Sequence, residues 1–486
     1  MINPLGHSKH FAYDVGGNIT QMTDENGNIT QYRYSALGDI TEVIDANGEH
    51  TKYTYDAMRR LSAFELKGNE PQITTYWRNT KGEVEKVISP LGDVIKYRYD
   101  QAGNVTSKRD QDGLTTHYDY TPAGRLAKIS YADGKTVEFG YNALKQLTEM
   151  RDWLGTTKIE ADALGRATKV TNHEGNEVSY TWNSLGKRES LGYPDGSKVD
   201  YSYDASGRLT QVKVGADTTN YIYDKMGRIT QRVLPDNTST KYEFNPLGSL
   251  IGLTHSKGSE ILDRFSYIHD PVGNITQIEK HRAGIESDNG LFSYTYDRMN
   301  RLTEVVHGDS LRRYAYDSIG NRINSEIDGV NLCHNYNAKN QLISTTIQDV
   351  TTQDNMTVYR YDKRGNLRAI GEHGKQTAAF DYDARNMLTR ATTSEGTTRY
   401  GYNGFRKRVG KYETLHQADG TYDLTREFCY TLDLTRPYDN LLAMCAQSAV
   451  SQNTANQNTT SQNFIWGNGL LSASTQDSTD SSFYYL

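Results

Sequence analysis

The 486-residue chain carries 60 acidic and 54 basic side chains, and its formal net charge of -6 excludes the basic surface of a nucleic-acid-binding protein. Apolar residues make up only 36%, which predicts a thin-walled body with much surface instead of one thick core. No apolar run approaches the ~20 residues that span a bilayer, and Met1 to Asp14 show no signal peptide. A membrane span is therefore not expected.

A Tyr-Asp pair or a close variant recurs from Tyr13-Asp14 to Tyr402-Asn403, in steps that are mostly 21 residues. By our count there are 19 copies, which indicates a repeat architecture that ends near residue 410. The repeat tyrosines assigned to this motif include Tyr13, Tyr55, Tyr99, Tyr203, Tyr223, Tyr316 and Tyr361. Tyrosine suits a half-buried pleated surface, with its ring packed and its hydroxyl in water.

Each copy is expected to form two strands joined by a tight turn. Thr51, Tyr53 and Tyr55 alternate with polar residues, as in a strand with one covered face. In the turn that follows, Asp accepts hydrogen bonds through its side chain and Gly supplies a positive φ. These structural turn residues include Asp14, Gly17, Asp56, Asp100, Gly103, Asp204, Gly207, Asp224, Gly227, Asp317, Gly320, Asp362 and Gly365.

Some copies lack the turn glycine. Asn300, Asn340 and Asn386 replace it with the next-best residue for a positive φ. Arg59, Lys145 and Arg406 replace it without an evident reason in the sequence. The pattern therefore predicts the turn but does not account for these three basic residues.

A second turn closes each copy, as in Asp24-Glu25-Asn26-Gly27. Early glycines step by 10 or 11 residues, so each copy contains strand, turn, strand and turn, with no helix. Apolar residues after the first turn are three apart, as in Leu209 and Val212. A β-bulge at the turn exit would return both to one face.

About 38 strands spaced ~4.8 Å apart would form a strip of roughly 180 Å. A twisted sheet of that length cannot stay flat, so we expect it to coil with successive turns of the coil in contact. A compact β-solenoid and a set of propeller blades, each of ~40 residues, are the competing geometries.

The motif Tyr-x-Tyr-Asp-x-x-Gly-Arg/Asn-Leu/Ile-Thr resembles the RHS/YD-repeat family. Good matches are residues 97–106, 201–210 and 221–230, and the resemblance covers residues 1–410. It implies an all-β fold in which the hairpins form a long coiled sheet, part of a hollow cocoon-like shell. Family members include bacterial polymorphic toxins, shell components of insecticidal toxin complexes, wall-associated proteins and teneurins.

The resemblance also implies a function. The shell of such proteins typically encloses a C-terminal toxin domain, which would be this chain's partner, and delivers it in competition between cells. A cell-surface adhesin or carbohydrate-binding wall protein, with surface glycans as partners, is the alternative. Either function implies a secreted or cell-surface protein.

Residues 411–486 are interpreted as a divergent segment that leads toward the family's core. Asp433-Leu434-Thr435-Arg436, Tyr438, Trp466 to Leu471 and Tyr484-Tyr485-Leu486 resemble that approach. The Asp-Pro-x-Gly-Leu core signature is missing, so the chain is expected to be a fragment. A polar loop is expected over 446–463, from its Gln, Asn, Ser and Thr content.

No catalytic, cofactor-binding or metal-binding residue is assigned, and the chain is not expected to be an enzyme. An Asp that recurs in most copies marks turns and not one active site. His7 and His10 lack the further ligands of a zinc site. Cys333, Cys429 and Cys445 are too few for a disulfide scaffold, contain no C-x-x-C spacing and are expected to be inert.

Overall fold

The computed structural model describes residues 1–68, 70–348, 355–416, 424–435, 440–450, 453–475 and 484–485. Within these ranges the chain forms 43 strands and a single 3-10 turn at Glu286–Asp288, which confirms the all-β prediction. No helix in the described ranges is long and apolar enough to cross a membrane. Arg436, Tyr438 and Leu486, named above for their resemblance to the family's core approach, lie outside the described residues.

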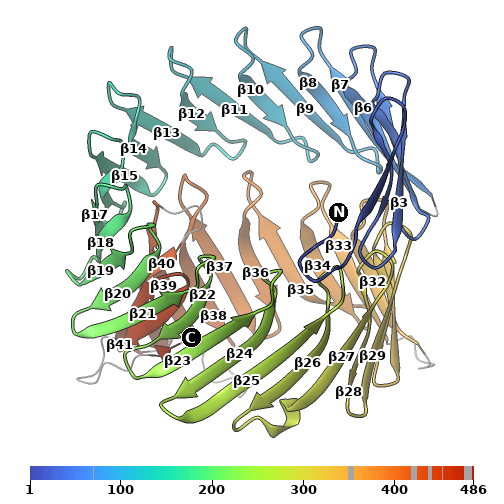
Figure 1. The fold of residues 1–486 in the computed structure, drawn as a ribbon. Coiled ribbons are helices and arrows are strands. Elements are labelled where there is room, and N and C mark those ends of the chain that lie inside the picture. Colours follow the sequence, from blue (N-terminus) through green and yellow to red (C-terminus); the bar gives the residue numbers. More distant parts are fainter. Residues whose placement is uncertain are drawn as a thin grey trace. The chain divides into compact units, whose positions relative to one another are not determined.

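The strands are short and closely spaced (Figure 1). The first are β1 (His10–Tyr13), β2 (Ile19–Thr23), β3 (Ile29–Tyr34), β4 (Ile40–Ile44), β5 (His50–Tyr55), β6 (Leu61–Lys67), β7 (Pro71–Arg78), β8 (Val84–Ile88), β9 (Val94–Tyr99), β10 (Val105–Arg109), β11 (Thr115–Tyr120), β12 (Leu126–Ser130), β13 (Thr136–Tyr141) and β14 (Leu147–Asp152). Next come β15 (Gly155–Ala161), β16 (Ala167–Thr171), β17 (Glu177–Trp182), β18 (Arg188–Gly192), β19 (Lys198–Tyr203), β20 (Leu209–Val214), β21 (Asp217–Tyr223), β22 (Ile229–Val233), β23 (Thr238–Phe244), β24 (Leu250–Lys257), β25 (Glu260–His269), β26 (Ile275–Arg282), β27 (Gly290–Tyr296) and β28 (Leu302–His307). The last are β29 (Ser310–Tyr316), β30 (Arg322–Ile327), β31 (Val330–Tyr336), β32 (Leu342–Ile347), β33 (Met356–Tyr361), β34 (Leu367–Glu372), β35 (Lys375–Tyr382), β36 (Leu388–Thr393), β37 (Gly396–Tyr402), β38 (Arg408–Leu415), β39 (Leu424–Asp433), β40 (Asn440–Val450), β41 (Asn453–Trp466), β42 (Leu470–Thr475) and β43 (Tyr484–Tyr485).

Neighbouring strands in the chain pair antiparallel, as β3 does with β2 and with β4. Strands β1 to β38 fall two to each Tyr-Asp copy, so each copy is one hairpin, and the second turn links it to the next. Antiparallel pairs need only short connections, which is why a 21-residue period contains no helix. The hairpin repeat expected from the sequence is therefore what the chain forms.

A β-bulge lies where Tyr-Asp hairpins turn back, as the pairings of β1 with β2, β3 with β4 and β19 with β20 show. In the first copy Ala12 pairs with Gln21 but Tyr13 pairs with Ile19, so one residue of the second strand is left over. The same shift recurs between Ser202 and Tyr203 in a later copy. There the left-over residue is Thr210, whose hydroxyl donates to the Ser202 carbonyl at 3.2 Å. The bulge confirms why apolar residues three apart share a face.

The turn aspartate organises its own turn through both carboxylate oxygens. Asp204 Oδ1 accepts the backbone N–H groups of Ser206 and Arg208, both at 2.9 Å, and its Oδ2 accepts Arg208 Nε at 2.6 Å. The turn closes with Gly207 at φ 75°, donating its N–H to the Asp204 carbonyl. Asn300, Asn340 and Asn386 take φ of 60°, 60° and 67°. Both turn predictions are confirmed.

The basic residues that replace the turn glycine also take a positive φ, at 62° for Arg59, 61° for Lys145 and 63° for Arg406. Such a backbone costs free energy for a residue with a side chain. At Arg59, the guanidinium recovers part of it by binding Asp39 at 2.8 Å and the Leu37 carbonyl at 2.9 Å, in the preceding copy. Arg406 donates likewise to the Arg385 carbonyl at 3.0 Å. A bond to the preceding copy accompanies both arginines.

The hydroxyls of several repeat tyrosines are not in water, which corrects the expectation from the sequence. Tyr55 donates its hydroxyl to the Ile40 carbonyl at 2.9 Å, and Tyr203 donates to the Arg188 carbonyl at 2.8 Å. In each case the acceptor is the first residue of the second strand of the preceding copy. The bulge leaves this carbonyl outside the regular ladder, so the tyrosine joins one hairpin to the next.

Contacts divide the chain into two compact units. Unit 1 comprises residues 1–96, 223–360 and 371–375, and unit 2 comprises 97–222, 361–370 and 376–486. The division does not fall at residue 410, because each unit combines early copies with late ones. Among the buried apolar side chains of the described residues, only Leu234 belongs to unit 1, and the others belong to unit 2. Side chains such as Tyr32 and Tyr53 in unit 1 are half-buried, as predicted for a thin wall.

Within unit 1, second turns of early copies contact Tyr-Asp turns of late copies. Asn26 Nδ2 donates to Asp270 Oδ2 at 2.9 Å, across 244 residues of sequence. Ser318 Oγ donates to the Lys67 carbonyl at 3.2 Å, across 251 residues. Lys339 forms an ion pair with Asp93. These contacts follow one another in sequence order, as expected when successive turns of a coiled strip touch.

Unit 2 has its own row of such contacts. Arg364 Nε donates to Asp112 Oδ2 at 2.7 Å. The Arg385 guanidinium lies 4.2 Å from the ring centroid of Trp153. The Gly404 N–H donates to Asp152 Oδ2, across 252 residues. We call these contacts the seam of unit 2; they fix the register of its late copies against its early ones.

Residues 446–450 and 453–463, the described part of this range, do not form the loop that their composition predicts. They belong to β40 and β41, which pair with each other through Ala446 and Thr460 among others. Strand pairing uses the backbone, and β39 and β42 supply partners on the outer sides of this pair. Tertiary pairing therefore overrides the polar composition.

Candidate functional site

Strands β39 to β42, here called the C-terminal segment, continue the antiparallel sheet after β38. Their side chains meet the repeat strands β17 to β21 of the same unit. Leu442, Ile465 and Leu471 are buried in the segment, while the repeat strands contribute Val178, Leu191, Val199, Tyr201 and Val212. We call this buried region the seat of the C-terminal segment.

An ion pair between Arg188 and Asp433 lies at the seat. Arg188 Nη1 is 2.6 Å from Asp433 Oδ2, with 4% and 0% of the two side chains exposed. Arg188 Nη2 also donates to Thr435 Oγ1, and Asp433 Oδ1 accepts the Thr435 N–H at 3.0 Å. Arg188 begins β18 and Asp433 ends β39, so the pair holds the last residue of one strand against the first of another.

Burial dominates the electrostatics of this pair. The Arg188 guanidinium lies 5.1 Å from the Tyr180 ring centroid. Burial, the largest single effect, would lower the pKa of Arg188, but the charge of Asp433, its hydrogen bond and the nearby Tyr201 and Tyr180 together outweigh burial and raise that pKa. Burial, and then the same negative charge, raise the pKa of the Tyr180 hydroxyl far above its usual range. The cluster is therefore charged only at Arg188 and Asp433, and each neutralises the other.

Hydrogen bonds and one close approach complete the seat. Tyr193 donates its hydroxyl to the Phe464 carbonyl at 2.8 Å, and the Tyr221 hydroxyl accepts the Asn468 N–H at 3.3 Å. A Cβ added to Gly467 would lie 2.3 Å from that Tyr221 hydroxyl. Only glycine lets the segment approach β21 this closely. These contacts bind the segment to two repeat copies, one that contains Tyr193 and one that contains Tyr221.

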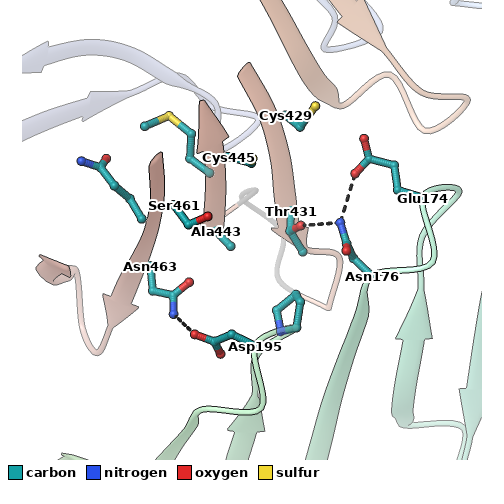
Figure 2. Close-up of a pocket in the computed structure, with 12 residues that line it drawn as sticks. Glu174, Asn176, Asp195, Cys429, Thr431, Ala443, Cys445, Ser461 and Asn463 are labelled. Atoms are coloured by element: carbon teal, nitrogen blue, oxygen red, sulfur yellow. Dashed lines mark hydrogen bonds between the residues drawn. The ribbon is translucent and has the colours of Figure 1, made fainter. Parts of the chain in front are cut away.

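A pocket of about 340 Å³ lies beside the seat, between the second turns at 172–176 and 193–197 and the C-terminal segment (Figure 2). Asn176 donates to Thr431 Oγ1 at 3.4 Å, and Asn463 Nδ2 donates to Asp195 Oδ2 at 2.5 Å. Cys429 and Cys445 line it from β39 and β40. The pocket thus lies where the seam of unit 2 reaches the C-terminal segment.

The turn residues assigned from the sequence stay apart from this site. Each of Asp14, Asp56, Asp100, Asp204 and Asp224 lies in the turn of its own hairpin, so the fold does not gather them into one constellation. Hydrogen bonds that hold the charged form lower the pKa of each of these carboxyls. In the described residues no group of three or more His, Cys, Asp or Glu side chains could hold a metal ion.

Arg188 was missed in the sequence although a signal for it exists. The residue two positions after the turn glycine is normally apolar, as in Leu209 after Gly207 and Ile229 after Gly227. Gly186 is followed at the same position by Arg188. At Arg188 this departure from the apolar pattern is matched by a buried partner, Asp433, from outside the repeats.

Comparison with known proteins identifies the family to which the chain is similar. The model of the teneurin YD-shell family matches residues 4–157, 154–260 and 247–419. The tRNA3(Ser)-specific nuclease WapA of Bacillus spizizenii is 24% identical over 307 residues, which are 55% of this chain and 13% of that protein. Double-stranded DNA deaminase toxin A of Burkholderia cenocepacia is 27% identical over 192 residues, covering 39% and 11%. Human teneurin-4 is 24% identical over 378 residues, covering 69% and 12%.

Solved structures share the fold. A crystal structure of TcdB2-TccC3-TEV matches with a TM-score of 0.67 at 13% identity, over 99% of this chain and 29% of that one. The Tc holotoxin pore of Photorhabdus luminescens matches with a TM-score of 0.64 at 15% identity, over 96% and 28%. The chain thus corresponds to less than a third of these structures and about an eighth of the first curated relative.

Proposed function

The chain belongs to the teneurin YD-shell family, and we propose on that premise that it is a wall segment of a bacterial shell that encloses a C-terminal toxin and helps to deliver it in competition between cells. The observation that supports this most is the seat. A repeat sheet that only formed a wall would not need a C-terminal segment anchored to it by a buried ion pair. The anchored segment supplies a fixed point from which a following domain would be held.

The rest of the wall fits this role. Successive hairpins are joined by turns, repeat tyrosines such as Tyr203 donate to the preceding hairpin, and late copies are joined to early ones within each unit. Relatives named as a nuclease and as a deaminase toxin share this repeat sequence over only 13% and 11% of their lengths. We propose that the wall itself is not an enzyme, because its recurrent carboxylates are engaged in turns. We also propose that it acts outside the cell that makes it.

Glycan binding is the weaker proposal. Sugar recognition uses exposed aromatic faces together with free polar groups, whereas tyrosines such as Tyr55 and Tyr203 give their hydroxyls to neighbouring carbonyls. A glycan array probed with the intact chain is expected to show no binding. Specific binding that is lost on replacing the exposed Trp77 with alanine would favour the adhesin instead.

Electron microscopy and limited proteolysis of the polypeptide translated from the complete reading frame test the shell proposal. We expect a closed particle with internal density, and protection of the sequence that follows the seat. Asp433→Ala should expose that sequence to protease, while Asp200→Ala, at an exposed ion pair with Lys198, should not. An open or solid particle, or equal cleavage in all forms, would contradict the proposal.

A further inference from the structure

Two free cysteines stand directly opposite each other in the C-terminal segment. Cys429 of β39 pairs in register with Cys445 of β40, and both are half-buried and unbridged. The nearest shift in this ladder lies beyond them, between Thr431 and Leu432. Directly opposed residues of an antiparallel pair share a face, with Cα atoms about 4.5–5.5 Å apart. Disulfides bridge Cα separations of about 4.4–6.8 Å, so the Cα spacing expected for this opposed pair fits a disulfide.

We propose that Cys429 and Cys445 form a disulfide that staples β39 to β40 when the protein meets an oxidising environment. One thiolate attacks an external low-molecular-weight disulfide such as oxidised glutathione and releases one thiol. The second cysteine then attacks the mixed disulfide and releases the other thiol. Two protein thiols are thereby oxidised and one external disulfide is reduced to two thiols. Export, part of the proposed function, would supply that environment.

The surroundings of the two cysteines predict that the disulfide forms slowly. Both cysteines line the pocket beside the seat, and Glu174 lies at its edge (Figure 2). Burial, and then the negative charge of Glu174, raise the pKa of Cys429 to about 11. Cys429 must act as a thiolate in one of the two steps, whichever cysteine attacks first. The staple should therefore form slowly at neutral pH, and faster once the charge of Glu174 is removed.

The staple would act on the seat. Asp433 lies between the two cysteines in sequence, in the same β39 that Cys429 occupies. Closing the chain from Cys429 to Cys445 restricts every residue between them in the unfolded state. The buried contact of Asp433 with Arg188 would therefore be harder to lose after oxidation than before it.

Peptide mapping of the full chain tests the proposal. The protein is equilibrated with reduced and oxidised glutathione, quenched with an alkylating agent and digested without reductant. We expect one linked peptide pair that contains Cys429 and Cys445, and an alkylated Cys333. Cys333 is the internal control, because its strand neighbours are Asn324 and Thr346. Cys333→Ser should leave the linked pair unchanged, and Glu174→Gln should make it form several-fold faster.

Two results would overturn the proposal. In the first, Cys429 and Cys445 both remain alkylated at every glutathione ratio. In the second, they link to Cys333 or to a second molecule of the protein as readily as to each other. Because mapping of the wild-type protein alone decides this, the test does not depend on whether a variant folds. The linkage is measured on the isolated chain, so its failure would leave the shell proposal intact, and electron microscopy tests that separately.

Discussion

At the scale of single residues, the recurrent aspartate is a turn organiser whose charge is held by hydrogen bonds. Asn183, at the same position of another copy, accepts the N–H groups of Leu185 and Lys187 at 3.0 Å, as Asp204 does in its own turn. The amide thus reproduces the backbone bonds but not the charge-assisted bond from Arg208 to Asp204. Exchange of Asp for Asn along the repeats is therefore tolerated by the turn itself.

The stability of the chain should fall in acid because of these turns. The pKa of Asp204 and of Asp224 is lower in the folded chain than its usual value, chiefly through hydrogen bonds to the backbone N–H of Arg208 and of Arg228. A lowered folded pKa contributes stability above the unfolded value of about 3.9, and that stability is lost as pH falls through the folded pKa. Urea unfolding at a series of pH values should show a midpoint that decreases below about pH 4.

The matched variant for this prediction is Asp204→Asn with Asp224→Asn. It keeps the bonds to backbone N–H groups and removes two of the titrating carboxyls, so fewer protons should be taken up on unfolding in acid. The same acid dependence in the double variant as in the wild type would show that other groups carry it.

The repeat tyrosine is the second residue whose role the structure defines. Tyr55→Phe removes the hydroxyl that binds the Ile40 carbonyl, and we expect a loss of about 1 kcal/mol in the free energy of unfolding. Tyr13→Phe is the control, since Tyr13 belongs to the first copy and is 60% exposed. Its effect should stay within about 0.5 kcal/mol. Equal effects in urea unfolding would mean that the hydroxyl bond between copies contributes nothing.

At the scale of elements, the local sequence pattern predicts the hairpin but not the features that depend on other copies or strands. The turn glycines, the asparagines that replace them and the bulge at Thr210 follow from steric rules that act within a few residues. The positive φ of Arg59 depends on Asp39 in another copy, and the strands over 446–463 depend on β39 and β42. Such features need partners whose register the local sequence does not specify.

Gly404 shows how one turn is fitted to distant strands. A Cβ added there would lie 2.6 Å from Met150 Sδ and 2.8 Å from a methyl carbon of Val137, both fully buried. Gly404→Ala should therefore destabilise the chain by about 1–3 kcal/mol through overpacking. Gly401→Ala, where the nearest atom would be 3.7 Å away, should cost less. Thermal unfolding compares the two, and a larger loss for Gly401→Ala would contradict the fitted turn.

At the scale of the whole chain, contacts join residues hundreds of positions apart within each unit. The 21-residue period predicted a strip that folds back, but not which turns meet, because all copies share one motif. The copies differ at their turn tips. Leu164 is 78% exposed at the third position of its turn. Phe405 occupies the same position of a later turn, and its ring centroid lies 6.2 Å from that of Phe139. Long-range pairing is thus specified by departures from the repeat, and Arg188 is the departure on which the seat depends.

Breaking the Arg188–Asp433 pair is the sharpest test of that dependence. Asp433→Ala leaves the Arg188 charge buried without its counter-charge, and we expect a loss of about 3–5 kcal/mol in the free energy of unfolding. Asp200→Ala, whose partner Lys198 is 59% exposed, should change it by less than about 1 kcal/mol. Hydrogen exchange should accelerate first in β39 to β42, since the seat opens before the repeat hairpins.

The double variant Arg188→Met with Asp433→Leu separates anchoring from charge. Well-packed apolar replacements of a buried ion pair are often neutral or stabilising, so the double variant should recover most of the stability that Asp433→Ala loses. Slow exchange in β39 to β42 should return with it if the seat needs only a filled volume. Recovery of stability without recovery of slow exchange would show that the ion pair itself fixes where the C-terminal segment sits. If neither stability nor slow exchange recovers, the charges of the two side chains are required for the stability of the seat.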